Sequence, residues 1–447
     1  MTKIIDDHDR KIPTGNYRPS RYNVVSDDVS GLRAIYNTLS QNMVLLDQAE
    51  YDALLEGKPS QDALNTGIAV SNSTNELDVA IRLRAALKKQ GKEGLSISIL
   101  PSLGCNFSCG YCYNGLHTEV ENTEIPKSVT RAFEYAIENL PHDSLLHLCW
   151  YGGEPMLYQK RLPEWAKLFQ DLATRRRCKF RSDLLTNGSA ISIESAARLQ
   201  AAGIGAIQVS IDWPPRMSGR HMGTLDAKET LSRVLDNIDL IPSSIRVSLR
   251  INTFPGFLRT FSALLDEINH RVHRGIYAYC HRIYESNDKQ LNGEQAIMFR
   301  YRSTKAYSSD YLEAKRMLRR AGYEQEYFPD DFLDASCVAE SARDVIVNPD
   351  GDLKKCPREV SGPGAAISAD PASVEIANKY REYEAVTDVG CRECTYLPIC
   401  HGGCVKEAVE HPEDKDRRCT LWKFILPQEL TSYLINQQRT HNEKSHG

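Results

Sequence analysis

The sequence lacks the features that would place the protein in a membrane or on a nucleic acid. No apolar run approaches the roughly 20 residues that a membrane-spanning helix requires, and the N-terminal stretch MTKIIDDHDRKIP has no apolar core of the kind found in signal peptides. The 55 Lys and Arg and 59 Asp and Glu residues give a net charge of −4, and no long basic run occurs. We therefore expect neither a membrane nor a nucleic-acid partner, and a small molecule or a peptide fits better.

Internal repeats and low-complexity tracts are also missing. Because the chain has 447 residues, 41% of them apolar, we expect it to fold as two or three domains. Cysteine, by contrast, is plentiful. The 13 cysteines are an odd number and are clustered rather than evenly spread. Clustered thiols in a chain without a signal peptide indicate a reducing cytoplasm, where thiols bind metal more often than they pair.

The pattern of the chain changes near residue 94. Before it, apolar runs predict a hairpin, a helix that ends near Gly57 and a second helix, which together form a small module of their own. After it, six short apolar runs alternate with amphipathic segments, which predicts parallel strands joined by helical crossovers in an α/β fold, either a partial barrel or an open sheet. The predicted domains are residues 1–90, 94–300 and 330–425, with a C-terminal tail at 426–447.

Glycines and polar residues follow the ends of these predicted strands. Because ligands of parallel α/β sheets collect at the carboxyl ends of the strands, we expect one pocket to gather them. The alternative for Asp212 and Arg250 is that each is an ordinary polar residue at a strand end. The full set is Gly152, Gly153, Glu154 and Pro155 after the second strand, Asn187 after the third, Ser210 and Asp212 in the fourth, and Arg250 and Asn252 in the fifth.

The run CNFSCGYC after the first predicted strand brings Cys105, Cys109 and Cys112 together. Three thiolates hold a [4Fe-4S] cluster while leaving its fourth iron open for a substrate or cofactor. A zinc site completed by a histidine, or three buried free thiols, is the alternative. Structural zinc sites, however, prefer paired CxxC motifs and four protein ligands.

The CxxxCxxC spacing, with Tyr111 before its last cysteine, and the later GGEP run resemble the radical S-adenosylmethionine (SAM) superfamily. The resemblance implies a partial (β/α)6 barrel and a cluster whose open iron binds the amino and carboxylate groups of SAM. Cleavage of SAM would then yield a 5'-deoxyadenosyl radical that removes hydrogen from a substrate. The residues expected to contact SAM are Tyr111, Gly152, Gly153, Glu154, Pro155, Asn187, Ser210, Asp212, Arg250 and Asn252.

The residue types suit these roles. The two glycines would let the backbone approach the SAM ammonium group, and Glu154 would oppose its charge. Arg250 would pair with the SAM carboxylate. Ser210 and Asp212 would bind the ribose hydroxyl groups.

Seven further cysteines lie in the last quarter of the chain, at 337, 356, 391, 394, 400, 404 and 419. Zinc knuckles are the alternative here, because CxxC alone favours zinc. Their intervals resemble the SPASM domain, which adds auxiliary [4Fe-4S] clusters to radical enzymes, so three clusters are expected in all. The resemblance implies one auxiliary cluster on Cys391, Cys394, Cys400 and Cys419, and a second on Cys337, Cys356 and Cys404.

The second auxiliary cluster has only three evident thiolates. Its fourth iron would be open, ligated by a non-cysteine group, or held by the distant Cys280. Cys149 and Cys178 lie in or beside predicted strands and are expected to be core thiols.

The resemblance covers residues 94 to about 422 and implies an enzyme that modifies ribosomally made peptides. The expected reaction is oxidative cross-linking through a carbon–carbon, ether or thioether bond. The resemblance also implies that residues 1–90 form a winged-helix-like domain, which would bind the leader of a precursor peptide by strand addition. The other expected partner is a one-electron reductant of the flavodoxin or ferredoxin type. Residues 1–90 could instead be a structural extension.

Two other functions stay open. Anaerobic sulfatase maturases carry an acidic residue directly after the cysteine that corresponds to Cys356, whereas Pro357 and Arg358 follow it here. A non-catalytic iron–sulfur scaffold or electron-transfer protein would use the same cysteines. Such a protein would not need the GGEP run or the polar strand ends.

Overall fold

The computed structural model describes residues 15–90, 94–107, 109, 111–112, 125–215, 226–283, 301–329, 337–341, 343–360, 380 and 382–445. The chain divides into two compact units. We call residues 91–325 and 338–381 the barrel unit, and residues 1–90, 326–337 and 382–447 the cysteine-rich unit. The domain boundaries predicted from sequence remain a prediction.

The barrel unit is built on parallel strands that lie side by side in sequence order, β6 to β11. Beside β6 the sheet is extended by parallel β12 (Asp344–Val347) and then antiparallel β13 (Leu353–Lys354). The six predicted strands therefore form as expected. They are β6 (Gly94–Ile99), β7 (Leu145–Trp150), β8 (Lys179–Thr186), β9 (Ile204–Trp213), β10 (Arg246–Thr253) and β11 (Tyr277–Arg282).

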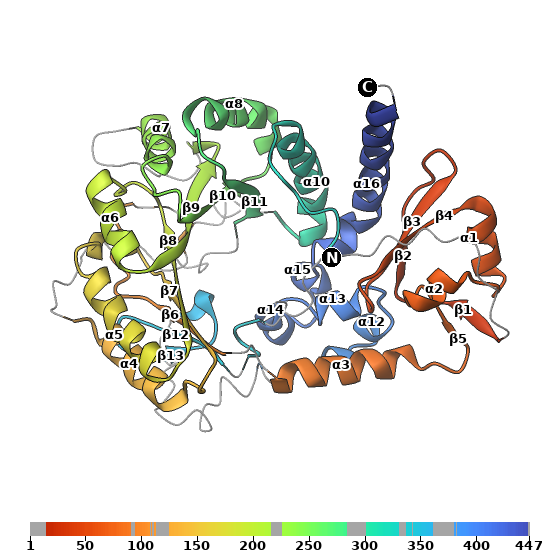
Figure 1. The fold of residues 1–447 in the computed structure, drawn as a ribbon, viewed down its shortest axis with the longest axis horizontal. Coiled ribbons are helices and arrows are strands. Elements are labelled where there is room, and N and C mark those ends of the chain that lie inside the picture. Colours follow the sequence, from red (N-terminus) through yellow and green to blue (C-terminus); the bar gives the residue numbers. More distant parts are fainter. Residues whose placement is uncertain are drawn as a thin grey trace. The chain divides into compact units, whose positions relative to one another are not determined.

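Helices cover the outer face of this sheet (Figure 1). Alternate strand residues, such as Leu146, Leu148 and Trp150 of β7, are fully buried beneath them, and each contributes roughly 1.5–3 kcal/mol through burial. The helices are α4 (Lys127–Asn139), α5 (Leu162–Arg175), α6 (Ile193–Ala201), α7 (Ala227–Ile238), α8 (Phe261–Arg271) and α10 (Thr304–Arg320), with short 3-10 turns at η1 (Pro155–Tyr158), η3 (Phe257–Thr260) and η4 (Pro357–Glu359).

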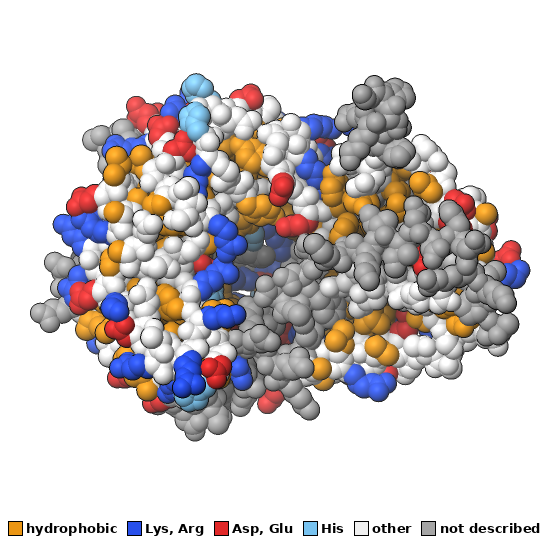
Figure 2. Space-filling model, in the orientation of Figure 1, with side chains coloured by type: hydrophobic (Ala, Val, Ile, Leu, Met, Phe, Trp, Pro, Cys, Tyr) orange, Lys and Arg blue, Asp and Glu red, His pale blue; other side chains and the backbone are white. Residues whose placement is uncertain are grey.

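The sequence also explains where these helices begin. Asp226 and Glu229 form a capping box at the start of α7, in which the Asp226 side chain accepts from Glu229 N and the Glu229 side chain accepts from Asp226 N, both at 2.9 Å. On the face shown in Figure 2, acidic and basic side chains are mixed over the barrel unit. Among the described residues, no helix is long and apolar enough to span a bilayer.

The cysteine-rich unit combines both ends of the chain. Its N-terminal part contains a three-stranded antiparallel sheet in the order β2-β3-β4 and a separate β1–β5 pair. The elements are β1 (Tyr17–Pro19), β2 (Asn23–Val25), β3 (Leu32–Asn37), β4 (Met43–Asp47), α1 (Gln48–Leu55), α2 (Gln61–Asn65), β5 (Ala69–Ser71) and α3 (Glu76–Gln90). The C-terminal part is helical, with η6 (Ala385–Thr387), α12 (Val389–Arg392), α13 (Leu397–Cys400), α14 (Val405–Glu410), α15 (Lys415–Arg418) and α16 (Trp422–Ser445).

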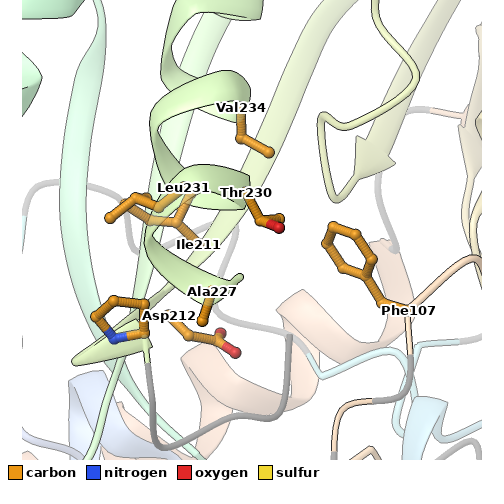
Figure 3. A pocket seen from close by; sticks show the side chains of 8 residues that line it. Phe107, Ile211, Asp212, Ala227, Thr230, Leu231 and Val234 are labelled. Atoms are coloured by element: carbon orange, nitrogen blue, oxygen red, sulfur yellow. The ribbon is translucent and has the colours of Figure 1, made fainter. Parts of the chain in front are cut away.

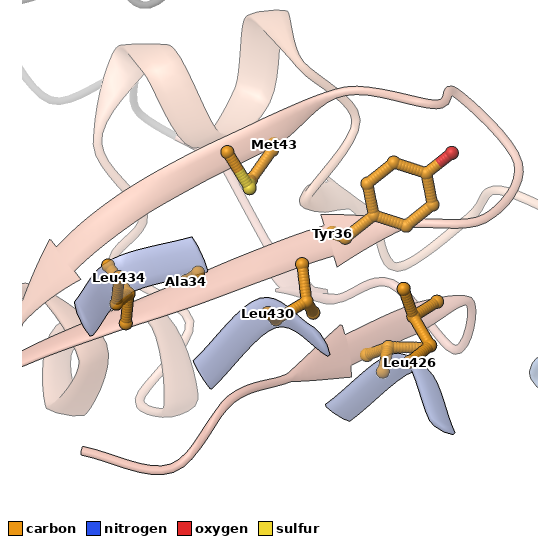
Figure 4. Close-up of a cluster of buried hydrophobic side chains, with 7 residues drawn as sticks. Ala34, Tyr36, Met43, Leu426, Leu430 and Leu434 are labelled. Carbon is orange, nitrogen blue, oxygen red and sulfur yellow. The ribbon is translucent and has the colours of Figure 1, made fainter. Parts of the chain in front are cut away.

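The two ends share a hydrophobic core. Leu426, Leu430 and Leu434, one helical turn apart on α16, pack against Ala34 and Tyr36 of β3 (Figure 4). The other face of the same sheet packs on α1 and α2. Residues 426–445 are expected from the sequence to be a C-terminal tail. They form most of α16 instead, and this helix completes the core of the N-terminal sheet.

Candidate functional site

The cysteine loop after β6 is held against the GGEP run, backbone against backbone. Gly153 N donates to Ser102 O at 3.0 Å, and Glu154 N donates to Gly104 O at 2.9 Å. A Cβ atom on Gly153 would stand 2.1 Å from Gly104 O, and one on Gly152, whose φ is +122°, would stand 2.6 Å from Ser102 O. The two glycines thus allow the cysteine loop to approach their own backbone. That they also lie close to SAM remains a prediction.

Glu154 connects the GGEP run to the end of β8. This buried carboxylate accepts from Thr186 Oγ1 and Asn187 N, both at 2.7 Å, and from Met156 N at 2.9 Å. Asn187 in turn donates from Nδ2 to Asn106 Oδ1 at 2.9 Å and lies 3.9 Å from Cys105 Sγ. The side chain predicted to oppose the SAM ammonium group is therefore also the buried acceptor that fixes the loop after β8 beside the cysteine loop.

Tyr111, inside the cysteine motif, reaches the ends of β9 and β10. Its hydroxyl donates to Asp212 Oδ1 at 2.6 Å, and Asn252 Nδ2 donates to the same oxygen at 3.0 Å. Arg250 Nε donates to Asn252 Oδ1 at 3.1 Å. These contacts link three of the predicted strand-end residues to the cysteine motif.

Arg250 also lies beside a neutral imidazole. Its Nη2 atom is 2.9 Å from His281 Nδ1 on the neighbouring strand β11. Burial and the nearby Arg250 charge lower the pKa of His281 to about 3. At neutral pH the imidazole of His281 therefore carries no charge.

A pocket lies between the cysteine loop and the start of α7 (Figure 3). Phe107 from the loop faces Thr230 and Val234 of α7, while Asp212 lies at the end of β9 below them. The remaining lining residues are Ile211, Pro215, Ala227 and Leu231. This pocket has an apolar wall and a carboxylate at one end.

The structure thus brings the predicted strand-end residues to one edge of the sheet. Ser210 is placed by register alone, opposite Arg250 on the neighbouring strand. Sequence reasoning did not single out Asn106, Phe107, Thr186 and Ser189, although Asn106 and Phe107 lie within CNFSCGYC and Thr186 and Ser189 lie within two residues of Asn187. The signal available in the sequence was that each of the four residues stands next to, or within two residues of, a residue already expected in the site.

Four of the C-terminal thiols line one cavity in the cysteine-rich unit, namely Cys391, Cys394, Cys400 and Cys419. Two cations lie beside their sulfur atoms: Lys423 Nζ is 3.5 Å from Cys419 Sγ, and Arg418 Nη2 is 3.7 Å from Cys391 Sγ. Burial raises the pKa of Cys400 to about 12, so a bound metal would have to displace its proton. The donor set fits a cluster held by four thiolates, with cations that offset part of its negative charge.

The other thiols are distributed differently. Cys337 and Cys404 belong to the cysteine-rich unit and Cys356 to the barrel unit, so this second ligand set remains a prediction. Burial raises the pKa of Cys149 to about 12 and also raises the pKa of Cys280. Among the described residues, no three His, Cys, Asp or Glu side chains form a site for a single metal ion.

Comparisons with known proteins agree with this geometry. Residues 99–266 match the family model of the radical SAM superfamily. Fe-coproporphyrin III synthase of Methanosarcina barkeri is 26% identical over 223 residues, which are 50% of this chain and 52% of that protein. The radical SAM cyclopropyl synthase TigE of Paramaledivibacter caminithermalis is 20% identical over 227 residues, which are 46% of this chain and 47% of that protein.

The fold also matches solved structures. Native anSMEcpe with bound AdoMet superposes with a TM-score of 0.55 at 15% identity, covering 76% of this chain and 98% of that one. The same protein with bound AdoMet and the Cp18Cys peptide gives a TM-score of 0.53 at 15% identity, covering 75% and 98%. At this identity the likeness shows the fold.

The open parallel sheet with a three-cysteine loop at its carboxyl edge is the fold and site of a radical SAM domain. Residues 99–266 of this chain match the radical SAM superfamily, as the cysteine motif predicted. The chain spans about half the length of the curated relatives it matches, 52% and 47%.

Proposed function

We propose that the protein is a radical SAM enzyme that cleaves SAM and oxidatively modifies a peptide. Bound SAM and a [4Fe-4S] cluster on Cys105, Cys109 and Cys112 would supply a 5'-deoxyadenosyl radical. One observation carries the proposal: predicted cofactor-binding residues from four strand ends meet at the cysteine loop, through the contacts of Glu154 and Tyr111. A scaffold or electron-transfer protein would have no use for this arrangement.

The cavity of four thiols supports the oxidative character of the reaction. An auxiliary cluster there would accept the second electron of a cross-linking reaction, whereas a redox-neutral reaction would not need it. The Cp18Cys peptide bound to anSMEcpe supports a peptide as the substrate class. The name of the Methanosarcina relative favours a porphyrin substrate instead, and a substrate assay distinguishes the two. We expect the enzyme to act in the reducing cytoplasm.

The test of the proposal measures iron content and SAM cleavage. Anaerobically reconstituted protein should bind about twelve irons per chain, four for each cube, and should release 5'-deoxyadenosine when reduced. Cys105→Ala should abolish 5'-deoxyadenosine and lower the iron content by about one cluster. Cys178→Ala, at a site outside the predicted ligand sets, is the matched control and should change neither value. Zinc in the four-thiol cavity, with iron near four per chain, would contradict the auxiliary clusters.

We further propose that a leader peptide pairs with the open edge of β4. In the order β2-β3-β4, β4 is an edge strand, and no described strand covers its outer side. Asn37 N donates to Asn42 O, and hydrogen-bonded pairs alternate along an antiparallel ladder. The backbone groups of Met43 and Leu45 therefore point outward. Apart from Asp47 at its end, β4 carries no charged side chain, and an edge strand with outward-pointing backbone groups is suited to strand addition.

Proline substitution tests this edge directly. Leu45→Pro removes an outward-pointing N–H without removing a ladder bond to β3, so we expect the dissociation constant for the leader peptide to rise about ten-fold, the loss of roughly one hydrogen bond. Leu45→Ala removes the same side chain but keeps the N–H and serves as the control. Peptide-independent SAM cleavage should be equal in both variants. Equal peptide affinity in the two would rule out pairing at β4.

A further inference from the structure

The inner face of the barrel sheet carries a polar wall. In β/α barrels this face is ordinarily filled by branched apolar side chains. Here Leu148 and Leu184 are buried under the helices, and the alternating positions on the opposite face hold Ser96, His147 and Asp183, all partly exposed. His147 lies three residues before Trp150 at the end of β7, about 10 Å from the strand ends at 3.3 Å per residue.

Four side chains of this wall form one chain of contacts across three strands. His147 Nε2 lies 2.9 Å from Asp183 Oδ2, and Arg181 donates to both oxygens of Asp183, at 2.8 and 3.1 Å. On the other side of the ring, His147 Nδ1 lies 3.2 Å from Ser96 Oγ. The register pairs Ser96 with His147 and His147 with Arg181, so the parallel sheet itself holds the group in place.

The position of the protons follows from Asp183. Burial acts to raise its pKa, but the hydrogen bonds from His147 and Arg181 lower it overall. An ionised carboxylate can only accept hydrogen bonds, so His147 Nε2 carries the hydrogen atom. In the neutral ring, Nδ1 then presents its lone pair toward the Ser96 hydroxyl. The His147 side chain is 27% exposed, so part of the ring is open to the inner face beside Ser96.

Resting on the proposed function, we infer that His147 is the general base of the oxidative coupling and that Ser96 passes the proton to it. Asp183 and Arg181 are positioning residues that fix the tautomer of the ring. A hydrogen atom leaves the substrate carbon for the 5'-deoxyadenosyl radical, and this carbon then bonds to an atom of a second residue. Bond formation releases one proton, which His147 Nδ1 takes, and one electron, which goes to an oxidised iron–sulfur cluster. The second residue therefore belongs to a class that gives up a proton on coupling: a thiol, a hydroxyl or an aromatic ring.

The test uses the full reconstituted chain and synthetic peptides that carry a cysteine, a serine or a tyrosine as the second coupling residue. We expect His147→Gln to keep forming 5'-deoxyadenosine while the yield of cross-linked peptide per 5'-deoxyadenosine falls about 100-fold, at the lower end of general-base effects. Asp183→Asn should show the same uncoupling, because the amide can donate to Nε2 and turn the ring to the other tautomer. Added imidazole should restore coupling to His147→Ala but not to Asp183→Asn.

His273→Gln is the matched control. His273 Nδ1 lies 2.7 Å from Asp239 Oδ2, but the side chain is 75% exposed on the outside of the barrel unit. The variant removes the same kind of pair and should leave the coupling yield unchanged. The iron content of every variant shows whether it has folded and assembled.

Two results would overturn the inference while the proposed function stands. One is a wild-type coupling yield in His147→Gln, and the other is a parallel loss of product and 5'-deoxyadenosine, which would mean that His147 only places the substrate. Nitrogen NMR of histidine-labelled wild-type protein provides a test without substrate: we expect the Nε2–H tautomer at His147, and the Nδ1–H tautomer would refute the assignment. Wild-type protein that forms no 5'-deoxyadenosine would instead contradict the proposed function.

Discussion

At the residue scale, the backbone of the GGEP run packs directly against the backbone of the cysteine loop. The backbone amides of Gly153 and Glu154 hold the loop in place by donating hydrogen bonds to Ser102 O and Gly104 O. Glycine at position 153 is required by this contact alone, before any ligand is considered, because a Cβ atom would overlap two carbonyl oxygens of the loop. The GGEP run therefore sets the position of the predicted iron ligands as well as facing the expected SAM site.

Gly153→Ala tests this dependence. The new Cβ would lie 2.1 Å from Gly104 O and 2.4 Å from Leu103 O, so the loop must move. We expect reconstituted iron to fall by about one cluster, or four irons, and the free energy of unfolding to fall by roughly 1–3 kcal/mol. Gly275→Ala is the control, since a Cβ there meets no atom within 4 Å. Full iron content in Gly153→Ala would show that the loop tolerates the displacement.

At the scale of secondary-structure elements, the sheet β2-β3-β4 lies between two helical layers. One layer is α16 and the other is α1 with α2. The N-terminal residues therefore cannot be removed without exposing Leu426, Leu430 and Leu434, and a deletion of residues 1–90 would test stability before it tested peptide binding. Point changes on β4 avoid this difficulty.

Leu430→Ala measures how far the two ends of the chain depend on each other. Leu430 is fully buried, and the substitution should lower the stability of the unit by roughly 2–5 kcal/mol through the cavity that it leaves. Hydrogen exchange should then accelerate at the amides of β3 as well as in α16. Ile435→Ala, on the same helix but 40% exposed, should have little effect on either element. Unchanged protection of β3 in Leu430→Ala would mean that the N-terminal sheet is stable without α16.

At the scale of the whole molecule, the thiols other than Cys337, Cys356 and Cys404 fall into three environments: the loop at the sheet edge, the cavity lined by four thiols, and the packed barrel. Cys280 belongs to the third. It is 3% exposed, lies on β11 on the same side as Ala278, and burial raises the pKa of its thiol. This environment favours a neutral packed thiol over a cluster ligand.

We therefore expect Cys280→Ala to keep its full iron content and its peptide-modifying activity. Only a modest loss of stability should follow, about 1 kcal/mol for a small buried side chain. Cys419→Ala is the comparison variant, because the loss of one of four thiols should remove about four irons and destabilise the surrounding short helices. A loss of one cluster from Cys280→Ala would show that Cys280 closes the cluster predicted on Cys337, Cys356 and Cys404.

The sequence by itself determined the six parallel strands, the cysteine loop and the strand-end residues, because these depend on local periodicity and on the rule that parallel strands end at one edge. It also determined the superfamily, since the cysteine spacing lies within a few residues of chain. Only the tertiary structure decided that α16 completes the N-terminal sheet, that Glu154 holds the loop after β8, and that Ser96, His147 and Asp183 meet on the inner face. Each of these joins residues that are tens to hundreds of positions apart, and their meeting depends on strand register and helix packing, which no short stretch of sequence specifies.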